Sequence, residues 1–178
     1  MIFEKTKLPG VLIIQPSTFN DERGYLKELF HLAKYNKNEI NYNFVQDNFS
    51  KSRKNVLRGL HFQIKKPQGK LVTCLNGSVF DVVVDINPVS KTFTKYISVE
   101  LNDKNHKQIW IPPGYAHGFL VLSDSAEIFY KCTEIYYPDD QGGIIWNDAD
   151  ISISWPTINP ILSEKDKNLK SLKSNIKF

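Results

Sequence analysis

Three side chains that could move protons or stabilise negative charge lie in short apolar segments. His61 ends the motif Arg58-Gly-Leu-His61, Lys70 follows Gln68-Gly at the start of an apolar run, and Tyr130 lies inside another. Neutral imidazole is the side chain best suited to remove a proton near pH 7. A fixed cation stabilises charge that develops in a water-poor site. Each residue alone is more often structural, but together they indicate acid–base chemistry.

The histidine spacing argues against a metal site. Pro112-Pro-Gly-Tyr-Ala-His117 has the P-x-G-x-x-H form seen where a turn enters a strand of double-stranded β-helix (cupin) barrels. Metal-binding cupins also carry an H-x-H pair, whereas the corresponding stretch, Leu60-His61-Phe62-Gln63, has glutamine as its second member. Glutamine is a poor ligand for zinc or iron beside imidazole. We therefore expect neither a metal nor another cofactor.

Short strands must position these side chains. Runs rich in Val, Ile, Phe, Tyr or Leu, bounded by turn-forming residues, predict strands at 11–14, 25–30, 56–63, 70–75, 78–86, 93–101, 108–111, 117–122 and 127–133. Asn76-Gly77 between two runs predicts a hairpin. Helices are expected only at 32–40 and after Ser163, a suitable N-cap. The pattern predicts an all-β sandwich or barrel.

The run 78–86 has two different faces. Phe80, Val82, Val84 and Ile86 alternate with Asp81, Val83 and Asp85. Two carboxylates on one side of a mostly apolar strand are costly unless they are paired or face a wet cavity. The run therefore indicates either a polar interior or a structural salt bridge.

The composition indicates one globular domain that does not bind nucleic acid. A chain of 178 residues with 41% apolar residues can bury one core. The net charge is +4, of which +3 lies in the last sixteen residues, so the rest is nearly neutral. Instead of a basic stripe, the body has a short basic cluster around Arg53 and Arg58. This cluster fits a diphosphate better than a polymer.

The chain carries no sign of export or membrane insertion. Cys74 and Cys132 are isolated, which favours free buried thiols in a reducing compartment. The N-terminus lacks a signal-peptide core, and no apolar run approaches the ~20 residues of a membrane span. We expect a soluble cytoplasmic protein with no membrane partner.

Longer motifs span nearly the whole chain in a distinctive order. They are Asp21-Glu-Arg-Gly24, Phe44-Val-Gln-Asp-Asn48, Leu57-Arg-Gly-Leu-His61, Gln68-Gly-Lys-Leu-Val72, Val79-Phe-Asp-Val82, Trp110-Ile-Pro-x-Gly114, Ala116-His-Gly-Phe119, Tyr130, Trp155-Pro156 and Leu162-Ser-Glu-Lys-Asp166. This set resembles the RmlC family, the dTDP-4-dehydrorhamnose 3,5-epimerases. The resemblance implies one cupin-type jelly-roll domain over 1–178 with short peripheral helices, and a homodimer.

The resemblance also implies roles for the acid–base groups. The ketone at C4 of the family's substrate makes the hydrogens on C3 and C5 acidic through a shared enolate. By resemblance, His61 is the base and Asp166 the carboxylate that orients it. Lys70 then stabilises the enolate, and Tyr130 returns the proton from the opposite face.

Further matches are implied substrate contacts. Arg23 and Arg58 would hold the diphosphate, which suits the bidentate geometry of guanidinium. The nucleoside and sugar would be contacted by Glu28, Gln46, Asp47 and Asn48, with His117 near the sugar or phosphate and Lys165 as a supplement. Gln141 stands where many relatives carry Glu. Tyr136 or Tyr137 could stack on a base, although core packing is at least as common for such residues.

Three interpretations of the activity remain open. The first is 3,5-epimerisation of dTDP-4-dehydro-6-deoxy-D-glucose to dTDP-4-dehydro-L-rhamnose. The second is inversion at C3 only, or a GDP- or heptose-linked substrate. The third is a cupin that binds sugar nucleotides, or shifts their ketone, without epimerisation. The presence of His61, Lys70 and Tyr130 together weighs against the third.

Overall fold

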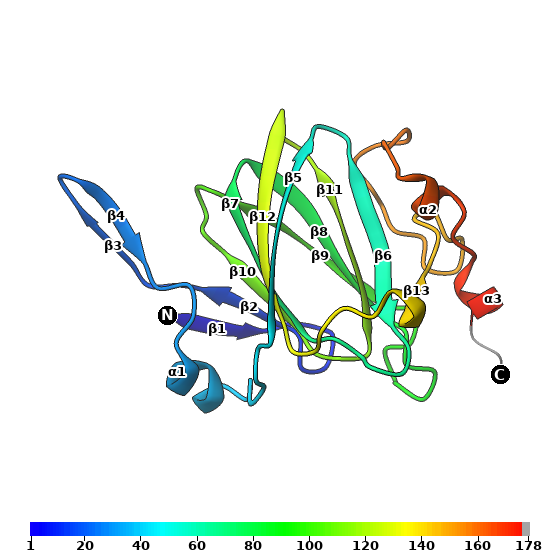
Figure 1. Ribbon diagram of the computed structural model, residues 1–178, viewed down its shortest axis with the longest axis horizontal. Helices are drawn as coiled ribbons and strands as arrows, with labels where there is room; N and C mark the ends of the chain where they lie inside the picture. The colour runs from blue at the N-terminus through cyan, green and yellow to red at the C-terminus, as the bar shows by residue number, and fades with distance from the viewer. Residues whose placement is uncertain (176–178) are drawn as a thin grey trace.

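Two antiparallel sheets face each other in a sandwich (Figure 1). In this computed structural model, which describes residues 1–175, one sheet has six strands and the other five. The six-stranded sheet runs β1 (Ile2–Lys5), β2 (Leu12–Gln15), β10 (Gln108–Ile111), β7 (Lys70–Asn76), β12 (Ser125–Cys132) and β5 (Gln46–Arg53). The five-stranded sheet runs β13 (Gln141–Gly143), β6 (Leu57–Gln63), β11 (Tyr115–Val121), β8 (Ser78–Asp85) and β9 (Tyr96–Asn102). The predicted all-β jelly roll of the cupin type is confirmed.

The main core lies between the two sheets and follows from strand alternation. Val72 and Cys74 of β7 and Val79 and Val83 of β8 are fully buried in it. The opposite face of β8 carries Val82 and Val84, which belong to a second cluster outside the five-stranded sheet. The two faces predicted for 78–86 are therefore confirmed, and they separate the interior from the outer layer.

Short helices and loops cover the outer faces of both sheets. Helix α1 (Leu32–Lys37) supplies Tyr35, which packs with Leu71 and Trp110 on the six-stranded sheet. Ile144, Ile151 and Leu172 of α3 (Leu172–Asn175) pack on the outer face of the five-stranded sheet. Two further short helices are η1 (Pro138–Asp140) and α2 (Glu164–Lys167). Within residues 1–175, no helix is long and apolar enough to cross a membrane.

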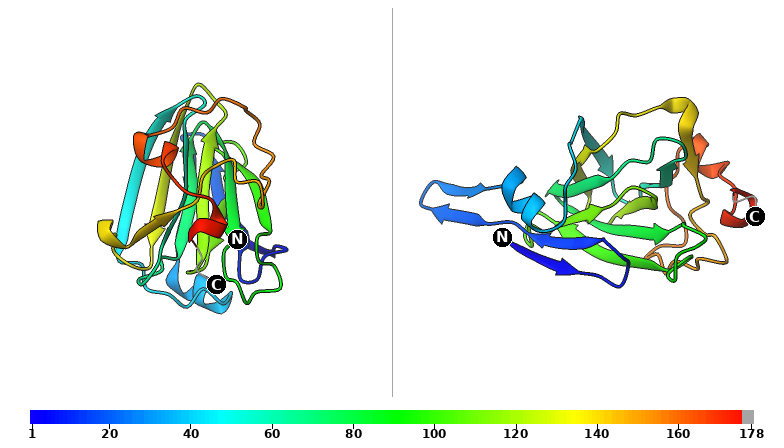
Figure 2. Two further views of the ribbon diagram at one scale, coloured as in Figure 1. Left: turned by 90° about the vertical axis from the view of Figure 1, so that its right-hand side faces the viewer. Right: turned by 90° about the horizontal axis from the view of Figure 1, so that it is seen from below.

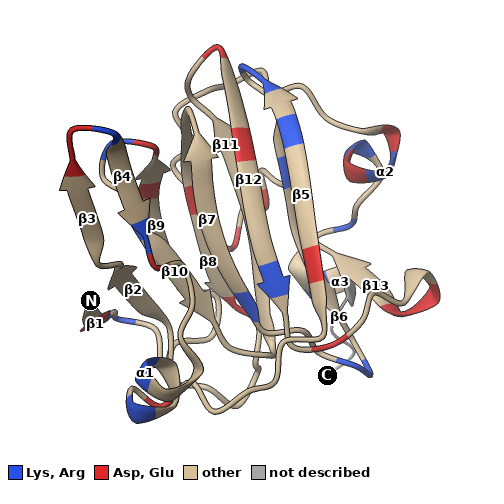
Figure 3. Cartoon of the chain, turned by 60° about the vertical axis from the view of Figure 1, so that its left-hand side comes forward, with Lys and Arg blue, Asp and Glu red and all other residues tan. Residues whose placement is uncertain are grey.

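A two-stranded hairpin projects from one end of the sandwich. It consists of β3 (Thr18–Asp21) and β4 (Gly24–Lys27), and it stands away from both sheets (Figure 2). Phe19 and Leu26 on it are 60% and 66% exposed. Figure 3 shows charged residues at its tip and places α2 at the far side of the molecule. An arm with exposed apolar side chains is a candidate contact surface for another chain.

The predicted hairpin at Asn76-Gly77 is wrong. The turn exists, with Gly77 at φ +77°, but β7 pairs with β10 and β12, whereas β8 pairs with β9 and β11. The chain therefore passes from one sheet to the other at this turn. Asn-Gly predicts a tight reversal of the chain, whereas the partners of each strand depend on packing elsewhere.

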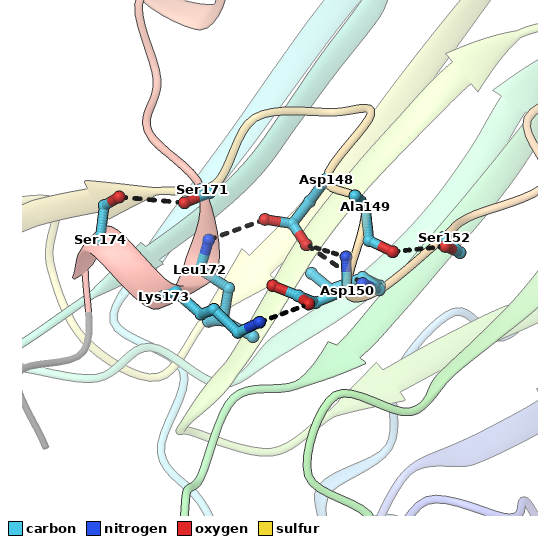
Figure 4. Close-up of polar contacts among 9 residues, drawn as sticks. Asp148, Ala149, Asp150, Ser152, Ser171, Leu172, Lys173 and Ser174 are labelled. Carbon is cyan, nitrogen blue, oxygen red and sulfur yellow. Dashed lines mark hydrogen bonds and ion pairs between the residues drawn. The ribbon is translucent and has the colours of Figure 1, made fainter.

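A segment that we term the C-terminal strap, residues 161–173, crosses β6. At its start, Ile161 forms a parallel bridge with Val56. Near its end, Lys170 O accepts from Ile145 N at 3.0 Å and Leu172 N donates to Asp148 Oδ2 at 2.8 Å. Figure 4 shows Asp148 joining the strap to the preceding loop. Both ends of the strap are thus fixed on the sandwich.

Candidate active site

A β-bulge in β6 turns two functional side chains to the same side. Arg58 and His61 are three residues apart, so a regular strand would place them on opposite faces. Opposite them on β11, however, Phe119 and His117 are only two apart, which gives β6 an extra residue between the pairs. Gly59 occupies the bulge at φ +125°, a conformation that glycine tolerates. Both Arg58 and His61 therefore line one cavity.

His61 is held by a carboxylate from the strap. Its Nε2 lies 2.6 Å from Asp166 Oδ1. Burial raises the pKa of Asp166, but the hydrogen bonds from His61 and from the backbone of Gly59 outweigh it, so the net pKa lies below its usual value. Ser163, the predicted N-cap of α2, accepts from Asp166 N at 3.1 Å. The imidazole is thus oriented by a charged carboxylate.

A second histidine–carboxylate pair lies beside the first. His117 of β11 is the Cα partner of His61, and its Nε2 lies 2.9 Å from Asp81 Oδ2. Asp81 is fully buried, and its Oδ1 has no hydrogen-bond partner among the described residues. Of the two carboxylates anticipated on β8, Asp81 forms this pair, whereas Asp85 accepts from the hydroxyls of Ser90 and Thr92.

Lys70 and Tyr130 face these histidines from the other sheet. They lie on β7 and β12, and both line the cavity with His61. Burial lowers the pKa of Lys70, and the Asp81 carboxylate opposes this shift. Burial also raises the pKa of Tyr130, with Arg58 acting against it. Desolvation therefore favours a neutral amine at Lys70 and a protonated phenol at Tyr130.

The cavity between the sheets has a volume of about 470 Å³. An adjoining hollow of about 230 Å³ shares His61, Lys70 and Tyr130 with it and adds Gln46 and Asn48. The predicted site residues that line the main cavity are His61, Lys70, Tyr130, Asp166, Arg58, His117, Gln141 and Lys165. The structure thus brings together side chains separated by up to 108 positions in the sequence.

Polar contacts fix side chains that line the cavity and the adjoining hollow. Arg58 Nε donates to Ser52 Oγ at 3.0 Å, and Gln46 Nε2 donates to Asn48 Oδ1 at 2.9 Å. Gln141 Oε1 accepts from Tyr136 Oη and from Lys165 Nζ. These contacts hold donors and cations around the opening, a suitable arrangement for an anionic ligand.

Three predicted contacts lie away from the cavity. Arg23 is at the tip of the hairpin and pairs with Asp21, and Glu28 pairs with Lys34. Asp47 is on the outer face of β5, where its carboxylate accepts from Lys131. None of the three lines the cavity of its own chain.

The residues that line the cavity without having been predicted as contacts include Tyr136 and Ser50. Tyr136, left open between stacking and packing, lies at the cavity wall and is 45% exposed. Ser50 lies on β5, and its hydroxyl is buried without a partner among the described residues. Alternation with Asn48 is the signal that would have found Ser50, had 46–53 been recognised as a strand.

A larger cavity of about 610 Å³ lies near Pro9, Phe62 and Tyr115, apart from this chemistry. The carboxylate of Asp85 lines it, and the oxygens of this group already accept hydrogen bonds. The candidate active site is therefore identified by the convergence of ionisable groups and not by the volume of the cavity.

The fold and the smaller cavity together define an enzyme of the cupin type, because ionisable groups converge from both sheets where a packed sandwich would carry apolar side chains. Comparison with known proteins identifies one family. Residues 5–174 match the family model described as dTDP-4-dehydrorhamnose 3,5-epimerase. The chain therefore belongs to the dTDP-4-dehydrorhamnose 3,5-epimerase family.

Individual relatives agree with this assignment. Proteins named dTDP-4-dehydrorhamnose 3,5-epimerase from Methanothermobacter thermautotrophicus and Escherichia coli K12 are 49% and 50% identical to the chain. The matches cover 97% and 98% of this chain and 95% and 96% of those proteins. The solved structure of RmlC from Legionella pneumophila in complex with dTDP-4-keto-L-rhamnose has a TM-score of 0.94 at 45% identity, covering 97% of this chain and 93% of that one.

Proposed function

We propose that the protein inverts C3 and C5 of dTDP-4-dehydro-6-deoxy-D-glucose and so produces dTDP-4-dehydro-L-rhamnose. The observation that carries the proposal is the placement of His61 and Tyr130 on opposite walls of one cavity, on β6 and β12 of different sheets. Inversion requires that a proton leave from one face of a carbon and return to the other. Family membership supports the same reaction.

The proposed mechanism uses only side chains of this chain. His61, oriented by Asp166, removes the proton on C3 or C5, and the electron pair moves into the C4 carbonyl to form an enolate. Lys70 stabilises the negative oxygen. Tyr130 then donates its phenolic proton to the opposite face of the same carbon, and the ketone re-forms. The substrate thereby gains and loses one proton at each centre. Before the second centre reacts, His61 gives its proton to solvent and the Tyr130 phenolate takes one from solvent.

The binding roles are also proposals. Arg58 and Lys165 line the cavity and are suited to the diphosphate. His117 lies beside His61, close to where the reacting sugar must sit. Gln46, Asn48, Gln141 and Tyr136 surround the adjoining hollow, which has room for part of the nucleotide.

We further propose that the protein works as a cytoplasmic homodimer. The hairpin supports the dimer, since it exposes apolar side chains and carries Arg23 away from the cavity of its own chain. A second copy would bury these side chains and receive Arg23 near its own diphosphate. The two free cysteines, Cys74 and Cys132, fit a reducing compartment.

Incubation with dTDP-4-keto-6-deoxyglucose in heavy water, followed by NMR, tests the reaction. We expect deuterium at both C3 and C5 of the product. Deuterium at C3 alone would indicate an epimerase of that centre only, and no incorporation would exclude this substrate for either reaction.

The acid is tested by Tyr130→Phe in the same experiment. We expect deuterium exchange to continue while inversion slows by about 10²–10⁴-fold, the usual contribution of a proton-transfer group. Exchange should instead stop at both carbons in His61→Asn. Normal inversion in Tyr130→Phe would show that another group supplies the second proton.

A further inference from the structure

Gln141 joins two cavity residues from different parts of the chain. Its Oε1 accepts from Tyr136 Oη at 2.6 Å and from Lys165 Nζ at 2.5 Å. Tyr136 precedes η1, Gln141 begins β13, and Lys165 lies on α2 beside Asp166. One carbonyl oxygen therefore ties the strap to the wall of the cavity.

Hydrogen-bond chemistry fixes the orientation of this amide. An ammonium group can only donate, and the amide nitrogen of glutamine can only donate. The oxygen of Gln141 must therefore face Lys165, and the Tyr136 hydroxyl donates to the same oxygen. Only one of the two flipped orientations of the Gln141 amide can therefore hold the ammonium of Lys165.

The contact also leaves the charge of Lys165 uncompensated by its partner. Two other lysines of the strap meet carboxylates, Lys167 with Glu164 at 2.6 Å and Lys173 with Asp150 at 2.8 Å. The carboxylate of Asp166 lies on His61. Lys165 instead meets a neutral amide, so its full positive charge remains at the cavity.

We propose that Gln141 is a positioning residue that sets the affinity of the site for the diphosphate of the ligand. It holds Lys165 at the cavity and, being neutral, keeps that ammonium available to a nucleoside diphosphate. A carboxylate at this position would hold Lys165 equally well but would compete with the ligand for its charge. The inference rests on the proposed nucleotide-sugar substrate.

Gln141→Glu is the decisive variant, because glutamate has nearly the same shape and keeps an acceptor for Tyr136 and Lys165. The probe is dTDP, and its dissociation constant is measured by calorimetry with the full chain. We expect binding about tenfold weaker at low salt, from one added charge close to the diphosphate. The difference should shrink as salt rises. Asn159→Asp adds the same charge at an exposed position outside the cavity and should bind dTDP like the parent.

A double-mutant cycle with Lys165→Met shows whether the effect passes through the lysine. Because the lysine is the mediator, Gln141→Glu should weaken binding much less in the Lys165→Met background. An equal loss in both backgrounds would overturn the inference, since the new carboxylate would then repel the ligand directly. Unchanged affinity in the single variant would overturn it too. Failure of the unmodified protein to bind dTDP would instead refute the proposed substrate class.

Discussion

At the scale of one residue, Lys70 illustrates how burial adjusts the pKa of a proposed catalytic group. Its side chain lies between the sheets, where desolvation lowers the pKa of the ammonium from 10.5 and the nearby Asp81 carboxylate limits the shift. The proposed reaction needs the charged form. The Asp81 carboxylate therefore acts against the loss of the proton that the proposed role of Lys70 requires.

The activity should fall on the alkaline side at a lower pH than an exposed lysine would permit. Because the pKa of Lys70 is lowered, the ammonium loses its proton below pH 10.5, whereas the raised pKa of Tyr130 keeps its phenol protonated there. A pH profile of kcat measures this limb. Lys70→Arg keeps the charge, so the limb should move to higher pH.

Tyr130→Phe is the control for this assignment. If its remaining exchange activity shows the same alkaline limb as the parent, Lys70 is the titrating group. A limb that persists in Lys70→Arg and disappears in Tyr130→Phe would assign it to the phenol instead. Lys70→Met should lower kcat by about 10²–10³-fold, as expected for loss of one electrostatic stabiliser.

At the scale of the element, the bulge in β6 determines which residues meet. The sequence motif predicted the types of residue at 58 and 61, but regular alternation would have separated them. The extra residue depends on the close approach of two backbones, since a Cβ at Gly59 would lie 2.6 Å from Gly118 Cα. Such a contact between distant segments has no local signal in either strand.

Gly59→Ala should therefore lose both stability and activity. We expect the free energy of unfolding to fall by about 2–4 kcal/mol, from the positive φ and the steric overlap together. Urea unfolding and kcat measure the two effects. Gly24→Ala is the matched control, since Gly24 has the same φ of +125° but open space around it. It should cost only about 1–2 kcal/mol, so an equal cost would show that crowding at Gly59 is unimportant.

The strap is the element that brings Asp166 to His61, and Asp148 anchors it. Asp148 is 3% exposed and accepts from the backbone N–H groups of Asp150, Ile151 and Leu172. Asp148→Ala leaves these donors without their partner, so we expect a loss of about 2–4 kcal/mol together with reduced kcat.

Asp150→Ala tests the specificity of that effect. It removes the exposed ion pair to Lys173 in the same cluster (Figure 4) and should change stability by less than about 1 kcal/mol. The variants are compared by urea unfolding and by turnover in native buffer. Full activity in Asp148→Ala would show that the other contacts of the strap suffice to place Asp166.

Sequence patterns predicted the elements better than their partners. Apolar runs located β6, β7, β8, β10 and β12, and Ser163 marked the start of α2. The pattern missed β5, whose residues Gln46–Arg53 are mostly polar because one face lines the cavity and the other faces solvent. The turn at Gly77 likewise gave no sign that it connects two sheets.

At the scale of the whole molecule, the predicted site is divided between two places. The proposed catalytic groups line the cavity, whereas Arg23 lies in the turn between β3 and β4 and does not line it. Figure 3 shows this hairpin on the side of the molecule away from α2. A guanidinium so far from the cavity can contact the diphosphate only in another copy. The proposed homodimer therefore accounts for the exposed apolar side chains of the hairpin and for the position of Arg23 away from the cavity of its own chain.

Mixing two inactive variants tests this exchange. In a mixed dimer, the His61→Asn chain keeps Arg23 and the Arg23→Ala chain keeps His61. The cavity of the His61→Asn chain would lack both groups. The cavity of the Arg23→Ala chain would combine its own His61 with the Arg23 supplied by the other chain. Activity should therefore return in the mixture, up to half of the parent value for each mixed dimer. If Arg23 acted within its own chain, both cavities would stay defective and the mixture would remain inactive. Light scattering must show that the dimers re-form after mixing, so that an inactive mixture of re-formed dimers counts against the exchange.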